Sequence, residues 1–391
     1  MEISLSAVSA TARKAVLINV DDAMGQPARR LAHSIDDLSI FQWVWEGYAT
    51  LTGMDRSPME QAAFLREVIP LGRPKVFRGL VTQWPAVMGS GTPSSLIDYL
   101  SAYAVSKLVG LSSVPRAAAG RFFYNDSMTG LNFVKRRMPF RAALDTLLQF
   151  ESNEQFGASA IQSILVDEYL PGFTDANRLL MLPDFVKPRA WIGNRSVVAA
   201  HYDVAENLAC VVSGRRRFTI FPPEQVANLY PGPFEVTPAG VVVSMVDFDN
   251  PNYHAYPRFK KALEAATVVD LHPGDAIYIP YLWWHHVRSL DPVNMLVNYW
   301  WEPESATIST PMDALRHAMV ALKGLPEHHR DAWYAMFAHF VFQQNGPVGE
   351  HIPSDRRGIQ GVLDKKALRA VFNALRIDKL YSQRQNGATV A

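Results

Sequence analysis

Three residues from distant parts of the chain have the side-chain types that could hold one transition metal. His201 and Asp203 are separated by a single residue, and two adjacent histidines, His285 and His286, follow much later. Alternate residues of a β-strand project to the same face, so a strand over 201–212 would place His201 and Asp203 side by side. One histidine from a distant strand would complete a set of two histidines and one carboxylate. Such a set binds Fe(II) and leaves coordination positions open for oxygen chemistry.

The spacing of these residues does not by itself identify a metal site, because H-x-D triplets are common in proteins. The spacing also does not choose between His285 and His286. Neighbouring strand residues face opposite sides, so one of the two can face inward, and periodicity does not say which. Tyr202 lies between the first two candidate ligands, so we expect it to point to the opposite face.

The run Arg215-Arg216-Arg217 indicates a second functional group beside the metal. If Ser213-Gly214 is the two-residue turn of a hairpin, Arg216 pairs with Val211 on the metal side. A buried cation needs an anion, and a guanidinium suits a carboxylate held through two hydrogen bonds. The alternative is that all three arginines form a solvated strand face. A turn displaced by one residue would also exchange the faces.

The composition is that of a globular protein and excludes several classes. The chain has 391 residues, 48% of them hydrophobic and 19% charged, with a formal net charge of +1 and no long run of either sign. This balance argues against binding to nucleic acid or to an anionic membrane surface. The only cysteine, Cys210, permits neither an internal disulfide nor a cysteine zinc cluster. We find no membrane-spanning stretch and no signal peptide, and therefore expect a soluble, cytoplasmic protein.

From about residue 158, the hydrophobic pattern has a period of two. Short apolar runs separated by Gly and Pro indicate a β-sandwich or barrel. The strands expected there are 160–166, 190–200, 201–212, 215–221, 266–271, 275–280, 284–290 and 294–301.

Helical patterns flank this β region on both sides. Before it, we expect helices over 58–68, from Thr92-Pro93 and over 139–150, with strands at 75–81 and 121–125. After it, we expect helices from Thr310-Pro311, from Pro326 and near 364–377. The predicted organisation is a helical N-terminal flank over 1–57, a catalytic domain over 58–302 and a helical region over 303–391.

The order of the motifs resembles that of a known enzyme family. The sequence is similar to the JmjC-type, cupin-8 group of 2-oxoglutarate oxygenases, and most similar to the branch of the asparaginyl hydroxylase that inhibits hypoxia-inducible factor. The resemblance covers roughly 60–302 and is strongest over 190–302. The motifs that carry it include His201-Tyr-Asp203, Gly214-Arg-Arg216, Phe221-Pro-Pro223, Pro273-Gly-Asp275, Trp283-Trp-His285-His286 and Val297-Asn298.

The resemblance implies a mainly β fold, a double-stranded β-helix of the cupin or jelly-roll type with flanking helices. It also implies that His201, Asp203 and His285 hold Fe(II), which selects the first of the two adjacent histidines. Arg216 stands where this branch usually has a lysine that binds the far carboxylate of 2-oxoglutarate. The remaining residues that the resemblance assigns to the cosubstrate pocket are Asn207, Asn298 and Gln162.

Two departures from the family pattern remove hydroxyl groups from the cosubstrate end of the pocket. Val198 replaces a threonine, and Ala160 takes the place of a tyrosine on the preceding strand. An arginine in place of the lysine could compensate, because it reaches further and offers more donors. The sequence therefore predicts a remodelled cosubstrate pocket.

The resemblance implies an oxygenase that uses Fe(II), 2-oxoglutarate and O2 to hydroxylate a protein or peptide side chain, or a small molecule. Trp284 and Trp300 are candidates for the cavity wall. One alternative is a non-catalytic cupin that binds a metal and a small molecule or partner. Another is a zinc or manganese cupin with isomerase or hydrolase activity, although such sites usually present more histidines. The C-terminal helices resemble a homodimer surface.

Overall fold

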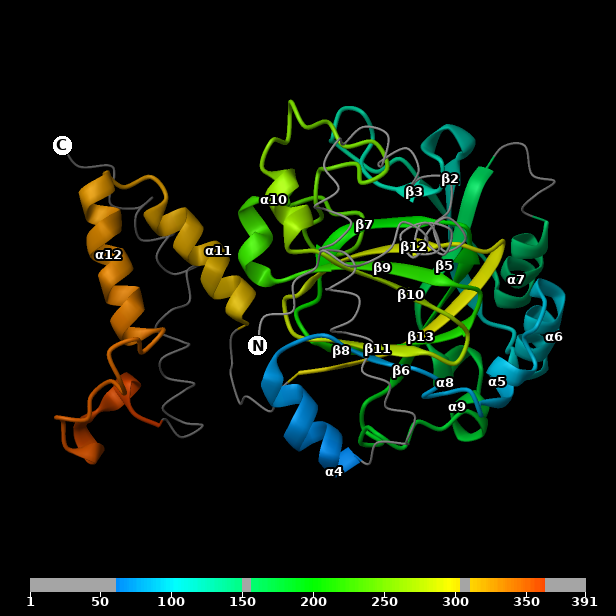
Figure 1. Cartoon of the computed structure of the whole chain (residues 1–391), viewed down its shortest axis with the longest axis horizontal. Helices are drawn as coiled ribbons and strands as arrows, with labels where there is room; N and C mark the ends of the chain where they lie inside the picture. The colour runs from blue at the N-terminus through cyan, green and yellow to red at the C-terminus, as the bar shows by residue number, and fades with distance from the viewer. Residues whose placement is uncertain (1–60, 150–155, 303–309, 363–391) are drawn as a thin grey trace, which may run out of the picture. The chain divides into compact units, whose positions relative to one another are not determined.

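The computed structural model describes residues 61–149, 156–302 and 310–362 (Figure 1). The chain divides into two compact units, Met1–Pro303 and Glu304–Ala391. The predicted N-terminal flank and the helix near 364–377 lie outside the described residues. No helix in the described ranges is both long and apolar enough to cross a membrane.

Two β-sheets form the first unit, and their strands are mostly antiparallel. The larger sheet has eight strands in the order β1-β11-β8-β13-β6-β5-β2-β4, and the smaller has five in the order β10-β9-β12-β7-β3. The bounds in the larger sheet are β1 Lys75–Phe77, β11 Ala276–Ile279, β8 Glu206–Ser213, β13 Val293–Trp301, β6 Pro188–Asn194, β5 Phe156–Leu165, β2 Leu108–Pro115 and β4 Val134–Pro139. Those in the smaller sheet are β10 Thr267–Leu271, β9 Arg216–Phe221, β12 Trp284–Ser289, β7 Val197–Tyr202 and β3 Arg121–Phe122.

The facing sides of the two sheets enclose an apolar interior. Its buried side chains include Ala209 and Val211 of β8, Phe218 and Ile220 of β9, and Leu296 of β13. Alternate residues of these strands therefore point inward, as the period of two predicts. Together with the flanking helices, this arrangement confirms the predicted cupin-type core.

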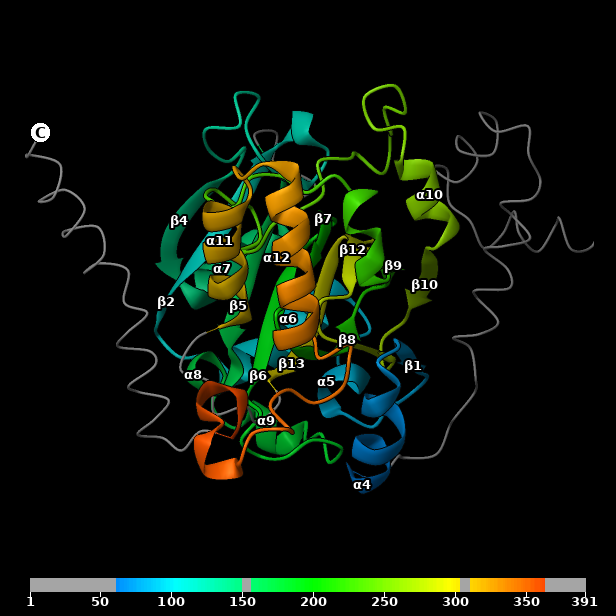
Figure 2. The ribbon, with the colours of Figure 1, turned by 90° about the vertical axis from the view of Figure 1, so that its left-hand side faces the viewer.

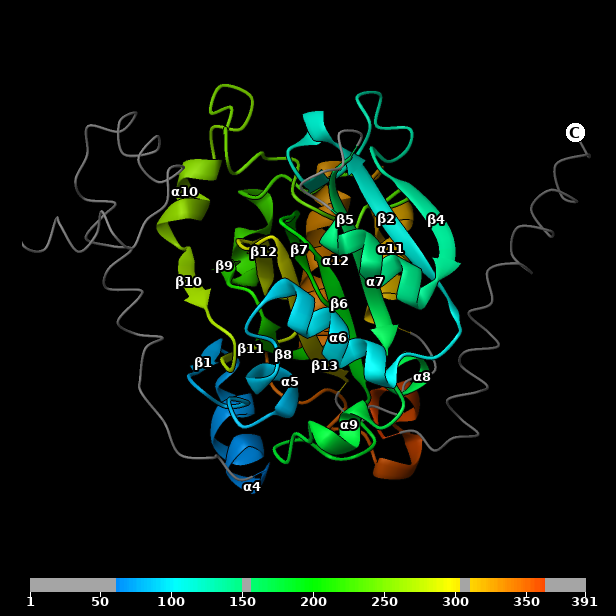
Figure 3. The same cartoon turned by 90° about the vertical axis from the view of Figure 1, so that its right-hand side faces the viewer.

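Helices cover the opposite face of the larger sheet. Figure 3 shows α6 (Pro93–Tyr103) and α7 (Phe140–Leu148) across it, and their buried leucines belong to the same apolar cluster as β2, β5 and β6. Thr92 caps α6 in a reciprocal capping box with Ser95, and Pro93 takes the first turn. The other helices of the unit are α4 Gln61–Ala63, α5 Pro85–Met88, α8 Val166–Tyr169, α9 Phe173–Ala176 and α10 Phe259–Glu264.

The predicted hairpin around Ser213-Gly214 is wrong. β8 pairs with β11 and β13 in the larger sheet, whereas β9 pairs with β10 and β12 in the smaller one. The chain therefore crosses between sheets at Gly214, where φ is +70°. A Cβ at this position would lie 2.3 Å from Oδ1 of Asn294, so the crossing requires glycine.

Other strand predictions differ from the structure in their boundaries. The expected strands 190–200 and 201–212 are three strands, because the chain turns at 195–196 and again at 203–205. Asp203 therefore follows the end of β7 instead of lying within a strand. The strands β2 and β4 were missed. β4 has the sequence Val-Lys-Arg-Arg-Met-Pro, whose exposed charges conceal a strand at the sheet edge.

The second unit contains the two predicted helices that lie in the described residues. Figure 2 shows them in succession as α11 (Pro311–Leu322) and α12 (Glu327–Phe340). Thr310 caps α11 by accepting a hydrogen bond from the backbone N–H of Asp313. None of the residues of either helix is buried, and large apolar side chains such as Trp333 and Phe340 are exposed.

Candidate metal centre

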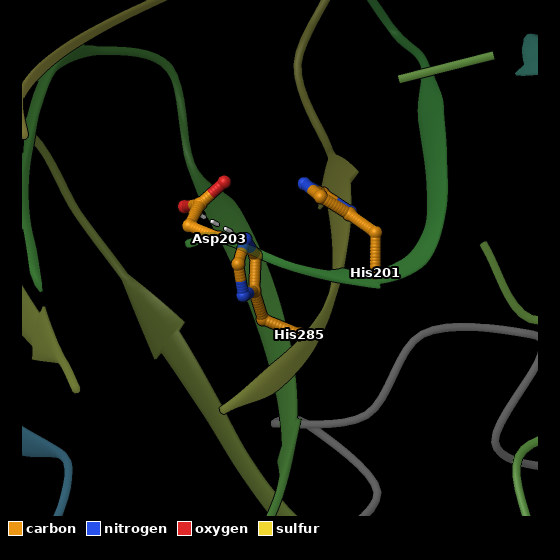
Figure 4. A group of neighbouring side chains, drawn as sticks. All are labelled: His201, Asp203 and His285. Atoms are coloured by element: carbon orange, nitrogen blue, oxygen red, sulfur yellow. Dashed lines mark ion pairs between the residues drawn. The ribbon is translucent and has the colours of Figure 1, made fainter. Parts of the chain in front are cut away.

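His201, Asp203 and His285 lie together between the sheets. His201 is near the end of β7 and faces its cross-strand partner His285 on β12, while Asp203 comes just after β7. One potential ligand atom from each residue lies within 4.8 Å of the others, and Figure 4 shows the three side chains converging. The Nε2 atom of His285 is 3.6 Å from Oδ2 of Asp203.

Backbone carbonyl groups orient both imidazole rings. Nδ1 of His201 lies 2.9 Å from the carbonyl oxygen of Ala199, and Nδ1 of His285 lies 3.1 Å from that of Trp283. A carbonyl only accepts, so each Nδ1 carries the proton and each Nε2 keeps a free lone pair. Burial and the neighbouring His285 lower the pKa of His201 to about 4, which keeps this ring neutral and able to bind a cation.

His286 points away from the triad, as strand alternation requires. Its ring stacks on Phe248, with 4.5 Å between the centroids and 12° between the planes. Burial, with Arg288 and Arg121 nearby, lowers its pKa to about 3, so the ring is neutral. His286 therefore packs in the core, and His285 is the member of the pair that faces the candidate ligands.

Two side chains from the larger sheet hold the Asp203 carboxylate. Asn207 Nδ2 donates to Oδ2 over 2.9 Å, and Trp300 Nε1 donates to the same oxygen over 3.1 Å. The structure thus places Asn207 against a candidate ligand. The sequence indicated Trp300 only as a candidate for the cavity wall and did not predict its hydrogen bond to Asp203. The available signal was that Trp300 shares a strand face with Asn298, two residues earlier.

A second layer of hydrogen bonds fixes these donors. Asn298 Nδ2 donates to Oδ1 of Asn207 over 3.4 Å, and Trp191 Nε1 donates to Oδ1 of Asn298 over 2.9 Å. The rings of Trp191 and Trp300 meet edge to face at 5.9 Å. Asn298 thus has the partners that a buried amide requires, and the network runs from Asp203 across β8, β13 and β6.

Arg216 is buried in the same interior, at the start of β9. Its Nη2 donates to the carbonyl oxygen of Trp191 over 3.3 Å, and its buried Nε has no hydrogen-bond partner. Desolvation lowers its pKa to about 10. Within the described ranges, Arg216 forms no ion pair. The site therefore contains a buried cation without an anion, the arrangement expected of a pocket for an anionic ligand.

The remaining predicted residues make other contacts. Gln162 accepts a hydrogen bond from Ser112 over 3.1 Å and lines a separate cavity at one end of the larger sheet. Val198 packs against the apolar interior, and Ala160 packs against the small cluster of Val114 and its neighbours. Neither of these two side chains offers a polar group to the pocket.

Comparison with known proteins agrees with this architecture. Residues 61–307 match the model of the family described as the cupin-like domain. Among curated proteins, the lysine-specific demethylase JMJ31 of Arabidopsis thaliana is 35% identical over 137 residues, which cover 35% of this chain and 23% of that protein. HSPB1-associated protein 1 of Rattus norvegicus is 34% identical over 173 residues, which cover 41% of this chain and 35% of that protein.

A third relative is matched over most of its length. The tRNA wybutosine-synthesizing protein 5 of Gallus gallus is 24% identical over 302 residues, which cover 68% of this chain and 87% of the relative. In contrast, the matches to JMJ31 and to the rat protein span roughly a quarter to a third of those relatives.

Proposed function

This chain belongs to the cupin-like domain family, and from its two-histidine, one-carboxylate cluster we propose that it is an Fe(II)- and 2-oxoglutarate-dependent oxygenase that hydroxylates its substrate. The observation that carries the proposal is the geometry of His201, Asp203 and His285. Both imidazole Nε2 atoms keep a free lone pair, and the carboxylate accepts hydrogen bonds from two N–H donors. His201, Asp203 and His285 would hold the iron.

The donor set fits non-haem iron and does not fit a structural zinc site. Two nitrogens and one carboxylate oxygen on one face are the ligands of non-haem Fe(II) oxygenases, which need open positions for a cosubstrate and O2. A structural zinc site has four protein ligands. In the described ranges, the cluster consists of these three residues and no cysteine.

Arg216 would bind the far carboxylate of 2-oxoglutarate. Its unpaired, buried guanidinium could form charge-assisted hydrogen bonds with a carboxylate, which would offset the cost of its burial. Val198 and Ala160 offer no hydroxyl group to the cosubstrate. Of these three residues, Arg216 is therefore the one that would bind the far carboxylate. With O2 as the oxidant, the bound iron would couple the oxidative decarboxylation of 2-oxoglutarate, to succinate and CO2, to the hydroxylation of a substrate C–H bond.

The other residues of the network position the site and limit water access. Trp300 and Asn207 donate to the Asp203 carboxylate, Asn298 donates to Asn207, and the Trp191 ring packs against that of Trp300. The apolar side chains between the sheets, including Phe218, exclude water from the interior. Donors to a ligating carboxylate strengthen metal binding by fixing its orientation.

For the substrate, we propose a protein or peptide side chain. Two of the relatives carry names that refer to lysine demethylation and to tRNA wybutosine synthesis, so proteins with this domain differ in what they act on. The formal net charge of +1 gives no overall attraction to nucleic acid. A cupin that binds its ligand without turnover is the second candidate, and it is favoured by the apolar Val198 and Ala160 at the cosubstrate end.

Anaerobic titration tests the proposal directly. Purified protein is titrated with Fe(II) and then 2-oxoglutarate while the visible metal-to-ligand charge-transfer band is followed. We expect the band in the wild type, no band in Asp203→Ala, and a much higher 2-oxoglutarate requirement in Arg216→Ala. Arg217→Ala is the matched control, because Arg217 is paired with Asp270 outside the pocket. Iron binding without any band would favour the second candidate.

A further inference from the structure

A cavity of about 250 Å³ lies at the end of the larger sheet. It is formed by β2, β4, β5 and β6, which lie side by side in Figure 3, and by α8. Its polar lining includes Lys135, Gln162, Ser163, Glu168 and Arg189. These side chains come from three strands and a helix, so the fold itself brings them together.

The cavity lies close to the metal centre. Arg189 is the cross-strand partner of Asn298, so the two side chains share the inner face of the sheet. The guanidinium of Arg189 lies 5.8 Å from the ring centroid of Trp300, and Trp300 donates to Asp203. One indole ring therefore separates the cavity wall from a candidate metal ligand.

The local backbone departs from regular strand geometry at the cavity. The pairing of β5 with β6 shifts register between Ile161 and Ile164, and Ser163 within this bulge has a φ of +54°. Arg189 Nη1 donates to both the carbonyl oxygen and Oγ of Ser163, over 3.0 and 3.2 Å. A left-handed serine is strained, and bulges of this kind commonly redirect side chains next to active sites.

The charges that line the cavity favour an anion. Lys135 and Arg189 form no ion pair within the described part of the chain, and Arg189 makes its two bonds through Nη1 only. Glu168 is already paired with Lys107. Gly110 makes room for Lys135, because a Cβ at Gly110 would lie 2.3 Å from the Lys135 Cε. Two cations with available donors thus line a cavity that contains one neutralised acid.

We propose that this cavity is a substrate subsite that binds a carboxylate or phosphate group of the primary substrate, with Arg189 and Lys135 as the binding residues. The inference rests on the proposed oxygenase function, since it places an anionic part of the substrate one indole ring from the iron ligands. Arg189 supplies a fixed fork of donors and Lys135 a mobile point charge. Gln162 adds an amide that already bonds Ser112.

The test uses the full chain loaded with Zn(II), a diamagnetic substitute for iron, and saturated with 2-oxoglutarate. Inorganic phosphate and acetate are titrated as minimal probes, and the arginine Nε–H signals are followed by NMR. The Arg189 signal is identified by its loss in Arg189→Gln. We expect saturable shifts of this signal in the wild type and at least about tenfold weaker probe binding in Lys135→Gln, the loss of one charge-assisted contact.

The matched control is Arg137→Gln, because Arg137 is an exposed cation on the same strand that does not line the cavity. Its probe affinity should stay within about twofold of the wild type, as followed by the same Arg189 signal. Binding of phosphate alone indicates a phosphorylated substrate, and comparable binding of acetate indicates a carboxylate. Non-saturable shifts, or equal weakening in Arg137→Gln and Lys135→Gln, would overturn the subsite.

Competition with the cosubstrate provides the second readout. Saturating phosphate should leave the 2-oxoglutarate affinity unchanged, because Arg216 holds the cosubstrate elsewhere. A rise in the apparent dissociation constant of 2-oxoglutarate would mean that the cavity binds the cosubstrate, which refutes a substrate subsite. The oxygenase proposal fails separately, if iron and 2-oxoglutarate give no charge-transfer band. The subsite fails if Lys135→Gln binds phosphate as the wild type does.

Discussion

Replacing Arg216 with methionine should make the ligand-free protein more stable. Burial lowers the pKa of Arg216 to about 10, well below the ordinary value of an arginine. At about 1.4 kcal/mol per pKa unit, the folded state disfavours this cation by about 3 kcal/mol. The hydrogen bond to the Trp191 carbonyl, which methionine loses, offsets part of this gain. We therefore expect Arg216→Met to stabilise the ligand-free protein by about 1–3 kcal/mol.

The sign of the pH dependence follows from the same shift. The folded-state pKa is lowered, so the cation destabilises the fold at every pH below about 10, and the penalty is relieved only as pH rises through that value. Between pH 6 and 9 the stability difference between Arg216→Met and wild type should therefore be constant. Urea unfolding followed by circular dichroism at several pH values measures it.

The ligand should offset most or all of the stability advantage of Arg216→Met. With Mn(II) bound and 2-oxoglutarate at about 100 times its dissociation constant, the wild type gains about 2.7 kcal/mol, while Arg216→Met gains far less. Arg217→Met is the control: Arg217 forms two bonds to Asp270, so its loss should slightly destabilise the protein and leave the 2-oxoglutarate effect intact. If ligand-free Arg216→Met were less stable than wild type, Arg216 would be a satisfied structural residue and our reasoning would fail.

Four further predictions follow from single features of the structure. Trp300→Phe removes one of the two donors to the Asp203 carboxylate and should weaken Fe(II) binding about 10–100-fold in an anaerobic titration; unchanged affinity would contradict a positioning role. Asp291→Asn should destabilise the protein by about 1 kcal/mol at pH 7. Burial alone would raise the pKa of Asp291, but hydrogen bonds from Arg215 outweigh it and lower this pKa. The stability difference from the wild type, measured by urea unfolding, should therefore disappear as pH falls below about 4. Gly214→Ala should destabilise the protein by about 2–4 kcal/mol in thermal unfolding, since it combines a positive φ with a clash, and a neutral result would contradict the sheet crossing. We propose a homodimer through the helical unit, so deletion of 304–391 should give monomers or insoluble protein in sedimentation experiments, and a well-behaved dimer without these residues would refute it.

Strand alternation predicted which side chains face the interior more reliably than it predicted how the strands pair. Val211 and Arg216 both point inward, although the hairpin that led to this expectation does not exist. A period of two specifies the face of each strand, but carries no information on which sheet the strand joins. The pairing depends on contacts between residues far apart in the chain, such as His201 with His285.

The hydrogen-bond network could not be predicted from periodicity. Asn207 and Trp300 bond one oxygen of Asp203 because β8 and β13 are neighbours in register. In the sequence, Asn207 and Trp300 are only two side chains with hydrogen-bonding groups within apolar strands, and nothing indicates that they share a partner. The cavity beside Arg189 was also hidden, since it depends on the bulge at Ser163 and on the edge strand β4, which was not recognised.

The histidine ligands and the aspartate ligand should differ in how sensitive their orientation is to substitutions at neighbouring residues. Each histidine is oriented by the backbone carbonyl group two residues earlier in the chain, and no substitution of a side chain can remove a carbonyl. Asp203 instead depends on an amide and an indole that single mutations can delete. Divergence among such proteins should therefore preserve the tautomers of the imidazole ligands while it adjusts metal affinity through the surroundings of the carboxylate.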